Sequence, residues 1–386
     1  MELRDALFAA LRYELAGVLP EGFSFDGADA DFLGALYHYA NRQEVAHLVG
    51  DALERLGVLE NAADETAELY RRRMAVAAYH AEQQRQVFEE VKNAFENAEI
   101  PYLPLKGLVI RPLYPEPWMR TAGDLDILVK DEDLARAEKC LLELGARRTK
   151  EGKHDISYFF PTGVMIELHY QLLEDKRANG AKEALEEIWQ HTERVSKERV
   201  EYRMEGAWLY YYHLVHAAKH LQEGTCGIRP FLDLWVIEHN MELDAAKCKK
   251  LLAEQGLSAF ANEAEKLSKF WLGGGAGDEW TTSLEAFLLA GGTFGSEATK
   301  RSIKTAGKGR KLRYYFFKVF LPYADLKVSY PMLERYPILF PFLQIKRWFR
   351  ILFCGGLRKN CELSKEADRI DKGACSLEAL RAHLEL

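Results

Sequence analysis

The sequence places two aspartates two positions apart in the stretch TAGDLDILVK, residues 121–130. Residues i and i+2 of a β-strand point to the same face and lie about 6.5 Å apart, so Asp124 and Asp126 project together while Leu125 and Ile127 point into a core. Two buried carboxylates on one face repel each other unless a cation neutralises them. Magnesium suits such oxygen ligands and leaves room for substrate phosphates.

A third acid lies in the apolar stretch VMIELHY, residues 164–170. There Met165, Glu167 and His169 share one face of a predicted strand. If this strand pairs beside the first, the two backbones lie about 4.8 Å apart, and Glu167 joins the aspartates. Three carboxylates can hold two metal ions for in-line nucleotidyl transfer. The alternative for an isolated D-x-D pair is a solvated strand end with salt bridges to lysines. The third acid, Glu167, favours the metal site over that alternative.

The stretch LPLKGLVIRPLYP, residues 103–115, precedes the acids. A glycine between a strand and a helix lets a ligand approach the backbone, and the helix start offers N–H groups to a phosphate. Lys106, next to Gly107, adds a positive charge for the same phosphate. Without the acids, this would be an ordinary strand-to-helix turn. Arg120 has two interpretations of equal weight: it neutralises the acids structurally, or it clamps a triphosphate.

The elements that must position these residues predict an α+β fold, with a small mixed β-sheet flanked by helical regions. Strand, helix, strand, helix, strand and strand follow one another between residues 100 and 173. The longest helical pattern, residues 65–97, contains neither proline nor glycine. We expect four regions: a helical amino-terminal region at 1–98, an α/β core at 99–175, a helical domain at 182–272 and a helical carboxy-terminal region at 278–386.

Composition and charge exclude several classes of protein. The 386 residues are 48% hydrophobic and 29% charged, as in ordinary globular proteins. The formal net charge of −7 argues against strong general nucleic-acid binding. The six cysteines include no CxxC pair, so neither a disulfide framework nor a zinc site is expected, and a cytoplasmic location fits best. We expect neither a signal peptide nor a transmembrane helix, because charges interrupt the apolar stretches.

Three histidines recur in the stretch YYHLVHAAKH, at His213, His216 and His220. Their spacing places them on one face of a helix. An H-x-x-x-H pair can bind zinc, and a metal hydrolase built on His216 and His220 is therefore one reading, although no HExxH motif or third ligand accompanies it. The alternative is a polar contact between helices, with Asp233 and Glu238 as partners, which we favour for His213.

The stretch PILFPFLQIKRWFRILF, residues 337–353, mixes aromatic and basic side chains. It suits a helix on a membrane surface or a helix that packs on the core and carries a basic rim. Its apolar residues do not segregate onto one face, which favours core packing. Membrane association is therefore not expected.

Taken in order, these pieces resemble the uncharacterised nucleotidyltransferase family of the polymerase-beta-like superfamily. The resemblance rests on K-G, then Y-P, then R-x-x-G-D-x-D-h-h-V, then h-E-h-H, where h is apolar, and covers about a quarter of the chain. The matching residues are Lys106, Gly107, Tyr114, Pro115, Arg120, Gly123, Asp124, Asp126, Val129, Glu167 and His169. In that superfamily the two aspartates and the third acid hold magnesium, and the nucleotide phosphates lie against the turn after the first strand.

The resemblance extends to H-x-x-x-H … R-x-x-x-D in the helical half, matched by His216, His220, Arg229 and Asp233. It implies that these residues, with His169, shape an acceptor pocket. One position departs from the wider superfamily, which has Gly-Ser at the first turn where this chain has Lys106-Gly107. A lysine replaces the charge interaction of that serine with the phosphates, but not its geometry.

The resemblance implies a magnesium-dependent nucleotidyltransferase, with manganese as the other candidate metal. It would move a nucleoside monophosphate from an NTP to an acceptor hydroxyl. Asp124, Asp126 and Glu167 would hold metal and carry catalysis, and Lys106, Gly107 and Arg120 would bind the nucleotide. The alternative is a catalytically inactive, nucleotidyltransferase-like module that holds nucleotide or a protein partner. The acceptor, the choice of NTP and the oligomeric state stay open.

Overall fold

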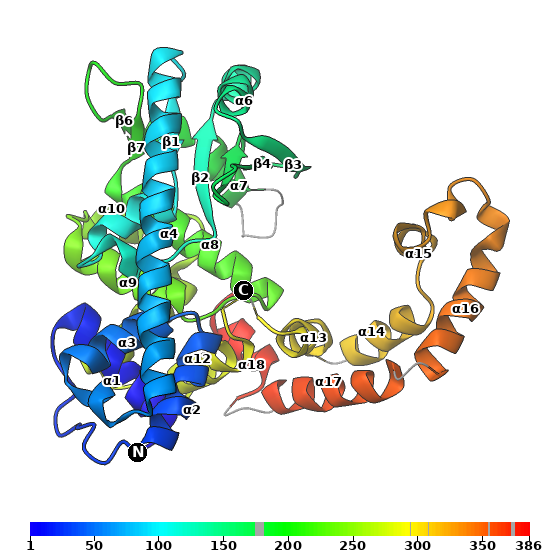
Figure 1. The fold of residues 1–386 in the computed structure, drawn as a ribbon. Helices are drawn as coiled ribbons and strands as arrows, with labels where there is room; N and C mark the ends of the chain where they lie inside the picture. Colours follow the sequence, from blue (N-terminus) through cyan, green and yellow to red (C-terminus); the bar gives the residue numbers. More distant parts are fainter. Residues whose placement is uncertain (174–180, 294, 308, 354–355, 372–374) are drawn as a thin grey trace. The chain divides into compact units, whose positions relative to one another are not determined.

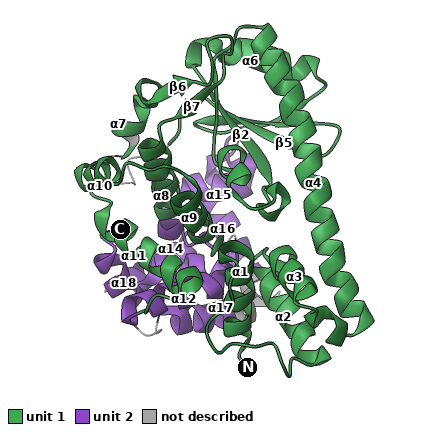
Figure 2. Ribbon diagram, turned by 90° about the vertical axis from the view of Figure 1, so that its left-hand side faces the viewer, with its two compact units in different colours: residues 1–219, 228–277, 385 green, residues 220–227, 278–384, 386 purple. Residues whose placement is uncertain are grey.

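The computed structural model describes residues 1–173, 181–293, 295–307, 309–353, 356–371 and 375–386 (Figure 1). These residues form two compact units (Figure 2). Apart from the last two residues, unit 1 comprises 1–219 and 228–277, and unit 2 comprises 220–227 and 278–384. The border expected at residue 175 lies outside the described residues. The architecture is α+β, as the sequence predicts.

Helices form the first part of unit 1, and the longest of them covers one face of the sheet. Their bounds are α1 (Leu3–Ala16), α2 (Ala30–Arg42), α3 (Ala46–Arg55), the 3-10 turn η1 (Val58–Asn61) and α4 (Asp64–Asn97). Helix α4 begins within one residue of its predicted start and ends where predicted. It buries Val87, Val91 and Phe95, which recur every four residues along one side and therefore face one neighbour.

A five-stranded mixed sheet follows, in the order β1-β2-β5-β4-β3. The pair β2–β5 is parallel and the other pairs are antiparallel. The strands are β1 (Tyr102–Pro104), β2 (Asp124–Val129), β3 (Arg147–Glu151), β4 (Asp155–Phe159) and β5 (Met165–His169). The connecting pieces are α5 (Gly107–Ile110), η2 (Arg111–Leu113), η3 (Pro117–Met119), η4 (Asp131–Asp133) and α6 (Leu134–Glu143). Strand β3 was not expected, because it is an edge strand with every residue exposed and therefore lacks an apolar alternation.

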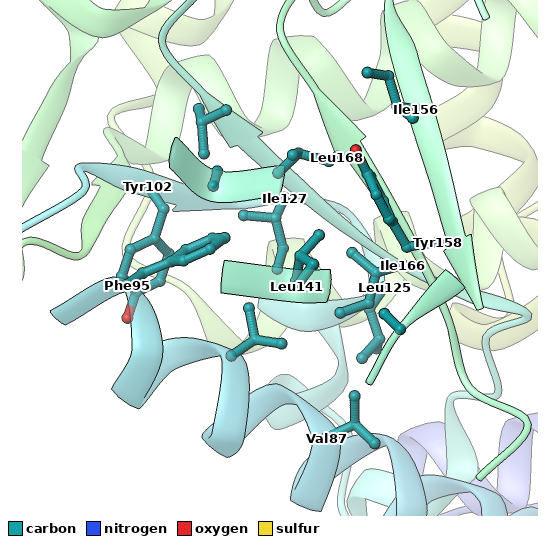
Figure 3. Close-up of a cluster of buried hydrophobic side chains, with 14 of the residues drawn as sticks. Val87, Phe95, Tyr102, Leu125, Ile127, Leu141, Ile156, Tyr158, Ile166 and Leu168 are labelled. Atoms are coloured by element: carbon teal, nitrogen blue, oxygen red, sulfur yellow. The ribbon is translucent and has the colours of Figure 1, made fainter. Parts of the chain in front are cut away.

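One face of this sheet forms the apolar core of the α/β part (Figure 3). The side chains Leu125 and Ile127 of β2 lie beside Ile166 and Leu168 of β5. Helices α4 and α6 cover them with Val87, Phe95 and Leu141. Because side chains alternate along a strand, the residues between them project from the opposite face. That face carries the acids of the predicted site.

The rest of unit 1 is helical apart from a small hairpin. Its elements are α7 (Ala181–Glu186), η5 (Ile188–His191), β6 (Thr192–Arg194), β7 (Tyr202–Met204), α8 (Gly206–Glu223), α9 (Arg229–Asn240), α10 (Ala245–Glu254), α11 (Ser258–Ser268) and the π-helical turn η6 (Lys269–Gly273). The hairpin β6–β7 was not expected, because three-residue strands such as Thr-Glu-Arg carry too little pattern to be recognised. Helix α8 runs from unit 1 into unit 2, since its last four residues belong to the second unit.

Unit 2 is helical throughout its described residues. Its elements are α12 (Glu279–Gly291), α13 (Glu297–Thr305), α14 (Arg310–Val319), α15 (Tyr323–Ser329), η7 (Pro331–Leu333), η8 (Pro337–Leu339), α16 (Phe340–Phe353), α17 (Gly356–Asp371) and α18 (Leu377–His383). Within the described residues, every helix is too short or too polar to cross a membrane.

A buried acid in α1 makes the stability of the protein depend on pH. The Glu14 side chain is fully buried, with Arg55 Nη1 at 3.3 Å. Burial, followed by repulsion from Asp51, raises the pKa of Glu14 from 4.5 to about 8. The unfolded chain releases this proton near pH 4.5, whereas the folded chain keeps it up to about pH 8. The free energy of unfolding therefore falls as the pH rises between these two values.

The variant Glu14→Gln removes this titration. We expect its stability to be close to wild type at pH 5, and higher than wild type at pH 8 by roughly 2–4 kcal/mol, since each unit of pKa difference corresponds to about 1.4 kcal/mol. Urea denaturation of both proteins across this pH range measures the difference. Parallel stability curves for the two proteins would contradict the expectation.

Candidate active site

The acids of β2 and β5 meet on the face of the sheet opposite the apolar core. Strand β2 lies beside β5 with Asp126 directly opposite Glu167, and Asp124 projects from the same face of β2. Within the described residues, Asp126, Glu167 and His169 form a group of potential metal ligands, with one donor atom from each residue within 4.8 Å of the others. The neighbouring strands expected from the sequence are therefore present, but this group contains His169 and not Asp124.

Asp126 is the buried centre of this cluster. Its Oδ1 accepts a hydrogen bond from Lys106 Nζ at 2.6 Å and another from His169 Nε2 at 2.8 Å. Burial would raise the pKa of Asp126, but the Lys106 ammonium and the bond from His169 outweigh burial and hold that pKa far below its usual range. The carboxylate is therefore ionised. Because an ionised carboxylate accepts hydrogen bonds only, His169 carries its proton on Nε2.

The pKa values of the other two acids are raised. Burial, then repulsion from Asp126, raises the pKa of Asp124. Burial, followed by repulsion from Asp124 and Asp126, raises the pKa of Glu167 to about 7. The site thus contains three acids, and Lys106 is the ammonium group bonded to one of them. The excess negative charge and the carboxylate oxygens fit a divalent ion such as Mg²⁺ or Mn²⁺. Asp126 and Glu167, with His169, have donor atoms close enough to hold it, and metal binding by Asp124 stays a prediction.

The turn that carries Lys106 has an unusual backbone. Lys106 has φ 44° and ψ −114°, a conformation that residues with a side chain rarely adopt. At Gly107 an added Cβ would lie 2.7 Å from Arg120 Nη1, so glycine makes room for the guanidinium. The amides of Leu108 and Val109 already donate to carbonyl oxygens of this turn. The close approach that Gly107 permits is thus made by Arg120, and contact of the turn with phosphate stays a prediction.

Arg120 joins the loop before β2 to helix α9. Its Nη2 donates to Asp233 Oδ2 at 2.9 Å, and the Tyr114 hydroxyl donates to Asp233 Oδ1 at 2.8 Å. Burial would raise the pKa of Asp233, but Arg120 outweighs burial and lowers it. Arg120 also opposes the rise in the pKa of Asp124. This geometry favours the structural interpretation of Arg120, with Asp233 as its direct partner.

Arg229 holds the helical part of unit 1 against the loop before β2, and His213 joins two helices within that part. Arg229 donates to the Thr121 carbonyl at 3.2 Å and to Glu44 at 2.7 Å. His213 contacts the neighbouring helix as expected, but its Nε2 donates to the Pro230 carbonyl at 2.7 Å rather than to Asp233 or Glu238. Glu238 instead accepts from Tyr210. Sequence alone could not distinguish a side-chain partner from a main-chain oxygen.

The remaining two histidines lie on α8. The ring centres of His216 and Tyr212 are 6.3 Å apart. His220 Nδ1 is 2.9 Å from Thr225 Oγ1. Within the described part of the chain, neither histidine belongs to a group of potential metal ligands. The acceptor-pocket roles of His216, His220 and Arg229 stay predictions.

Tyr212 is a residue near the acids that the sequence analysis missed. Burial raises the pKa of its hydroxyl to about 12, Lys106 opposes the rise, and Asp126 and Glu167 add to it, so the hydroxyl lies close to the cluster. In the sequence it belongs to a run of three tyrosines within a predicted helix, and the run itself does not distinguish one tyrosine from the others. The available signal was its spacing of four residues from His216, which places both side chains on the same face of α8.

A cavity of about 270 Å³ begins beyond the acids, where β2 and β5 end. Leu128 and Lys130 follow Asp126 on the same face of the chain, and they line the cavity together with Gln171 and Trp189. Lys130 Nζ lies 5.7 Å from the centre of the Trp189 ring. The cavity therefore offers apolar, aromatic and polar contacts beside the cluster of acids, as small-molecule sites commonly do.

Comparison with known proteins identifies the family of this chain. A family model described as an uncharacterised nucleotidyltransferase matches residues 32–273, more than half of the chain. This range includes every candidate residue from Lys106 to Asp233. Neither the curated proteins nor the solved structures contain a match.

Proposed function

We propose that this chain, which belongs to the uncharacterised nucleotidyltransferase family, transfers a nucleoside monophosphate from an NTP to an acceptor hydroxyl. The observation that carries the proposal is the register of β2 and β5, which sets Asp126 opposite Glu167, with Asp124 on the same face and Lys106 bonded to Asp126. Acids gathered on one polar face, beside a cation and a cavity, are the arrangement that phosphoryl-transfer chemistry requires.

Each of the three acids has a role in the proposed transfer. A divalent ion held by Asp124, Asp126 and Glu167 would supply charge stabilisation to the phosphate oxygens. Glu167 is 24% exposed against 3% for Asp126, so Glu167 meets the acceptor and takes the proton of its hydroxyl. The acceptor oxygen bonds to the α-phosphorus as the bond to the bridging oxygen breaks, and pyrophosphate leaves with that oxygen.

Lys106 connects the acids to the nucleotide. An ammonium has three donors, and the bond to Asp126 uses one of them. The other two can bind phosphate oxygens while the first still holds the carboxylate in place. Arg120 acts as a positioning residue, because it packs over Gly107 and is tied to Asp233. The cavity beyond β2 receives a part of the substrate that does not react, such as a base or a sugar.

A binding module without turnover is the second candidate. Lys106 and His169 both contact Oδ1 of Asp126, so this oxygen has two partners without a substrate. The departure from Gly-Ser at the first turn points the same way.

An assay with labelled nucleotide separates the two functions. We expect the full chain, incubated with Mg²⁺ or Mn²⁺ and each NTP in a metabolite, protein and RNA extract, to move the α-phosphate label onto an acceptor and to release the γ-phosphate label as pyrophosphate. EDTA should abolish both events. Equilibrium dialysis measures binding of the same nucleotides in parallel. Tight binding with no transfer to any acceptor would identify the binding module, and absence of both would contradict both functions.

A further inference from the structure

The charge of unit 2 is concentrated in residues 310–353, which we call the aromatic-basic segment. This segment contains nine lysines and arginines and two acids, so its formal charge is +7, whereas the whole chain carries −7. It comprises α14, α15 and α16 with the turns between them, and it lies beyond residue 273, where the match to the nucleotidyltransferase family ends. A strongly basic surface on an acidic protein indicates an anionic partner.

The same segment exposes large apolar side chains. Leu312, Val328 and Ile338 are 79%, 83% and 80% exposed, and Phe342 and Phe349 are exposed as well. Helix α14 buries none of its residues. The core-packing interpretation of residues 337–353 is therefore wrong for Ile338, Phe342 and Phe349. Their sequence pattern was misleading because the buried apolar cluster of the segment is small, with Leu326, Leu333 and Leu343 at its centre.

Contacts within the segment hold α16 against the end of α14. Trp348 Nε1 donates to the Val319 carbonyl at 2.6 Å, and Arg347 Nη1 donates to the same oxygen at 3.3 Å. The rings of Phe320 and Trp348 meet edge to face at 5.6 Å. Leu312, Phe342 and Phe349 are thus presented by a packed pair of helices, whereas Val328 lies on α15 and Ile338 on η8.

A groove of about 460 Å³ lies along α14. Arg313 and Lys318 lie over the rings of Phe317 and Tyr314, at 5.7 and 5.8 Å from the ring centres. The same groove is lined by Arg310 and by Lys304 of α13. Asp325 also lines the groove, but the four cations outnumber this carboxylate. Together with the two aromatic rings, they suit a phosphate group that is attached to an apolar chain.

We propose that the aromatic-basic segment binds the surface of a membrane containing anionic lipids, with a lipid phosphate in the groove along α14. Amphipathic helices that lie on membranes combine cations with aromatic and aliphatic side chains in this way. Nucleic acid shares the charge and stacks on aromatic rings, but the exposed aliphatic side chains Leu312, Val328 and Ile338 suit acyl chains rather than bases. The membrane association that the sequence argued against is thus supported by the exposed side chains of the structure.

Sedimentation of the full chain with vesicles tests this proposal. We expect binding to vesicles of phosphatidylglycerol mixed with phosphatidylcholine, and little binding to phosphatidylcholine alone. Arg313→Gln and Lys318→Gln should each weaken binding about fivefold, with a shallower dependence on salt. Leu312→Ser with Ile338→Ser should weaken it further. All four positions are on the surface or groove of unit 2, so the nucleotidyl transfer measured above should not change.

Matched controls lie on α4, where Val76 and Tyr79 are exposed apolar side chains and Arg72 is an exposed cation. Val76→Ser with Tyr79→Ser, and Arg72→Gln, should bind vesicles like wild type. Failure to bind the anionic vesicles would overturn the proposal. So would equal loss of binding in the control variants, or dimerisation that Leu312→Ser with Ile338→Ser abolishes, since a second copy would then cover the segment. Capture of an acidic protein by the segment in the absence of vesicle binding would also overturn it.

Discussion

Asp126→Asn is expected to lower the rate of nucleotidyl transfer by about a thousandfold or more. The substitution removes the charge that Lys106 and His169 both contact, and it removes the buried carboxylate of the proposed metal site. Glu167→Gln should lower the rate less, by about a hundredfold, because Glu167 is at the exposed edge of the cluster and contributes mainly proton transfer. Single-turnover transfer of the α-phosphate label measures both rates.

The controls for these variants are acids outside the cluster. Asp26→Asn and Glu132→Gln change exposed side chains and should leave the rate unchanged. Loss of the buried charge in Asp126→Asn also leaves Lys106 with a poorer partner, so thermal unfolding must show that the variant is folded at the assay temperature. Titration with Mn²⁺ gives a readout besides activity, since folded Asp126→Asn should bind the ion more weakly. A folded variant with wild-type transfer and wild-type Mn²⁺ binding would refute the metal role of this acid.

Arg120→Met is expected to lower the free energy of unfolding by about 3–5 kcal/mol. Asp233 is buried and Arg120 is only 11% exposed, and removal of one leaves the other as an uncompensated charge. Asp233→Asn should have an effect of the same sign and similar size. The double variant Arg120→Met with Asp233→Asn should lose less than the sum of the single variants, because neither charge is then left alone. Urea denaturation of the wild type, the two single variants and the double variant measures these free energies of unfolding.

The acid dependence of this pair follows from the pKa of Asp233, which the folded chain lowers below its ordinary value of 3.8. The contribution of the pair is therefore fully present above pH 3.8 and is lost as the pH falls through the lower, folded value. Effects of the two single variants below 1 kcal/mol that simply add would show that the pair contributes little. Activity gives a second readout: if Arg120 positions the Lys106–Gly107 turn, the turnover rate should fall in Arg120→Met at temperatures where the variant is folded.

The strands of the site could be predicted because their signals are local. An apolar run with acids at alternate positions fixes both the strand and the face that each acid occupies, and β2 and β5 followed that pattern. Partners distant in sequence could not be predicted in the same way. Arg120 pairs with an aspartate 113 residues away, and only the packing of α9 against the loop before β2 brings them together. Tyr212 was missed for the same reason, since its run of tyrosines is typical of a helix core.

The elements that the sequence analysis missed share a different cause. Strand β3 is entirely exposed, and the strands β6 and β7 have three residues each. Such segments have no apolar face from which a period can be read. The aromatic-basic segment shows the opposite case: its apolar content is high, but burial depends on neighbours that composition does not specify.

The path of helix α8 has a practical consequence for dividing this protein. Residues 220–227 belong to the second unit although they interrupt the sequence of the first. In that unit Thr299 Oγ1 donates to the Gly224 carbonyl at 3.1 Å. A fragment truncated after Gly277 would keep Gly224 and lose its partner, so no single cut yields either unit whole. Deletion analysis of catalysis or of lipid binding therefore has to rely on point substitutions in the intact polypeptide.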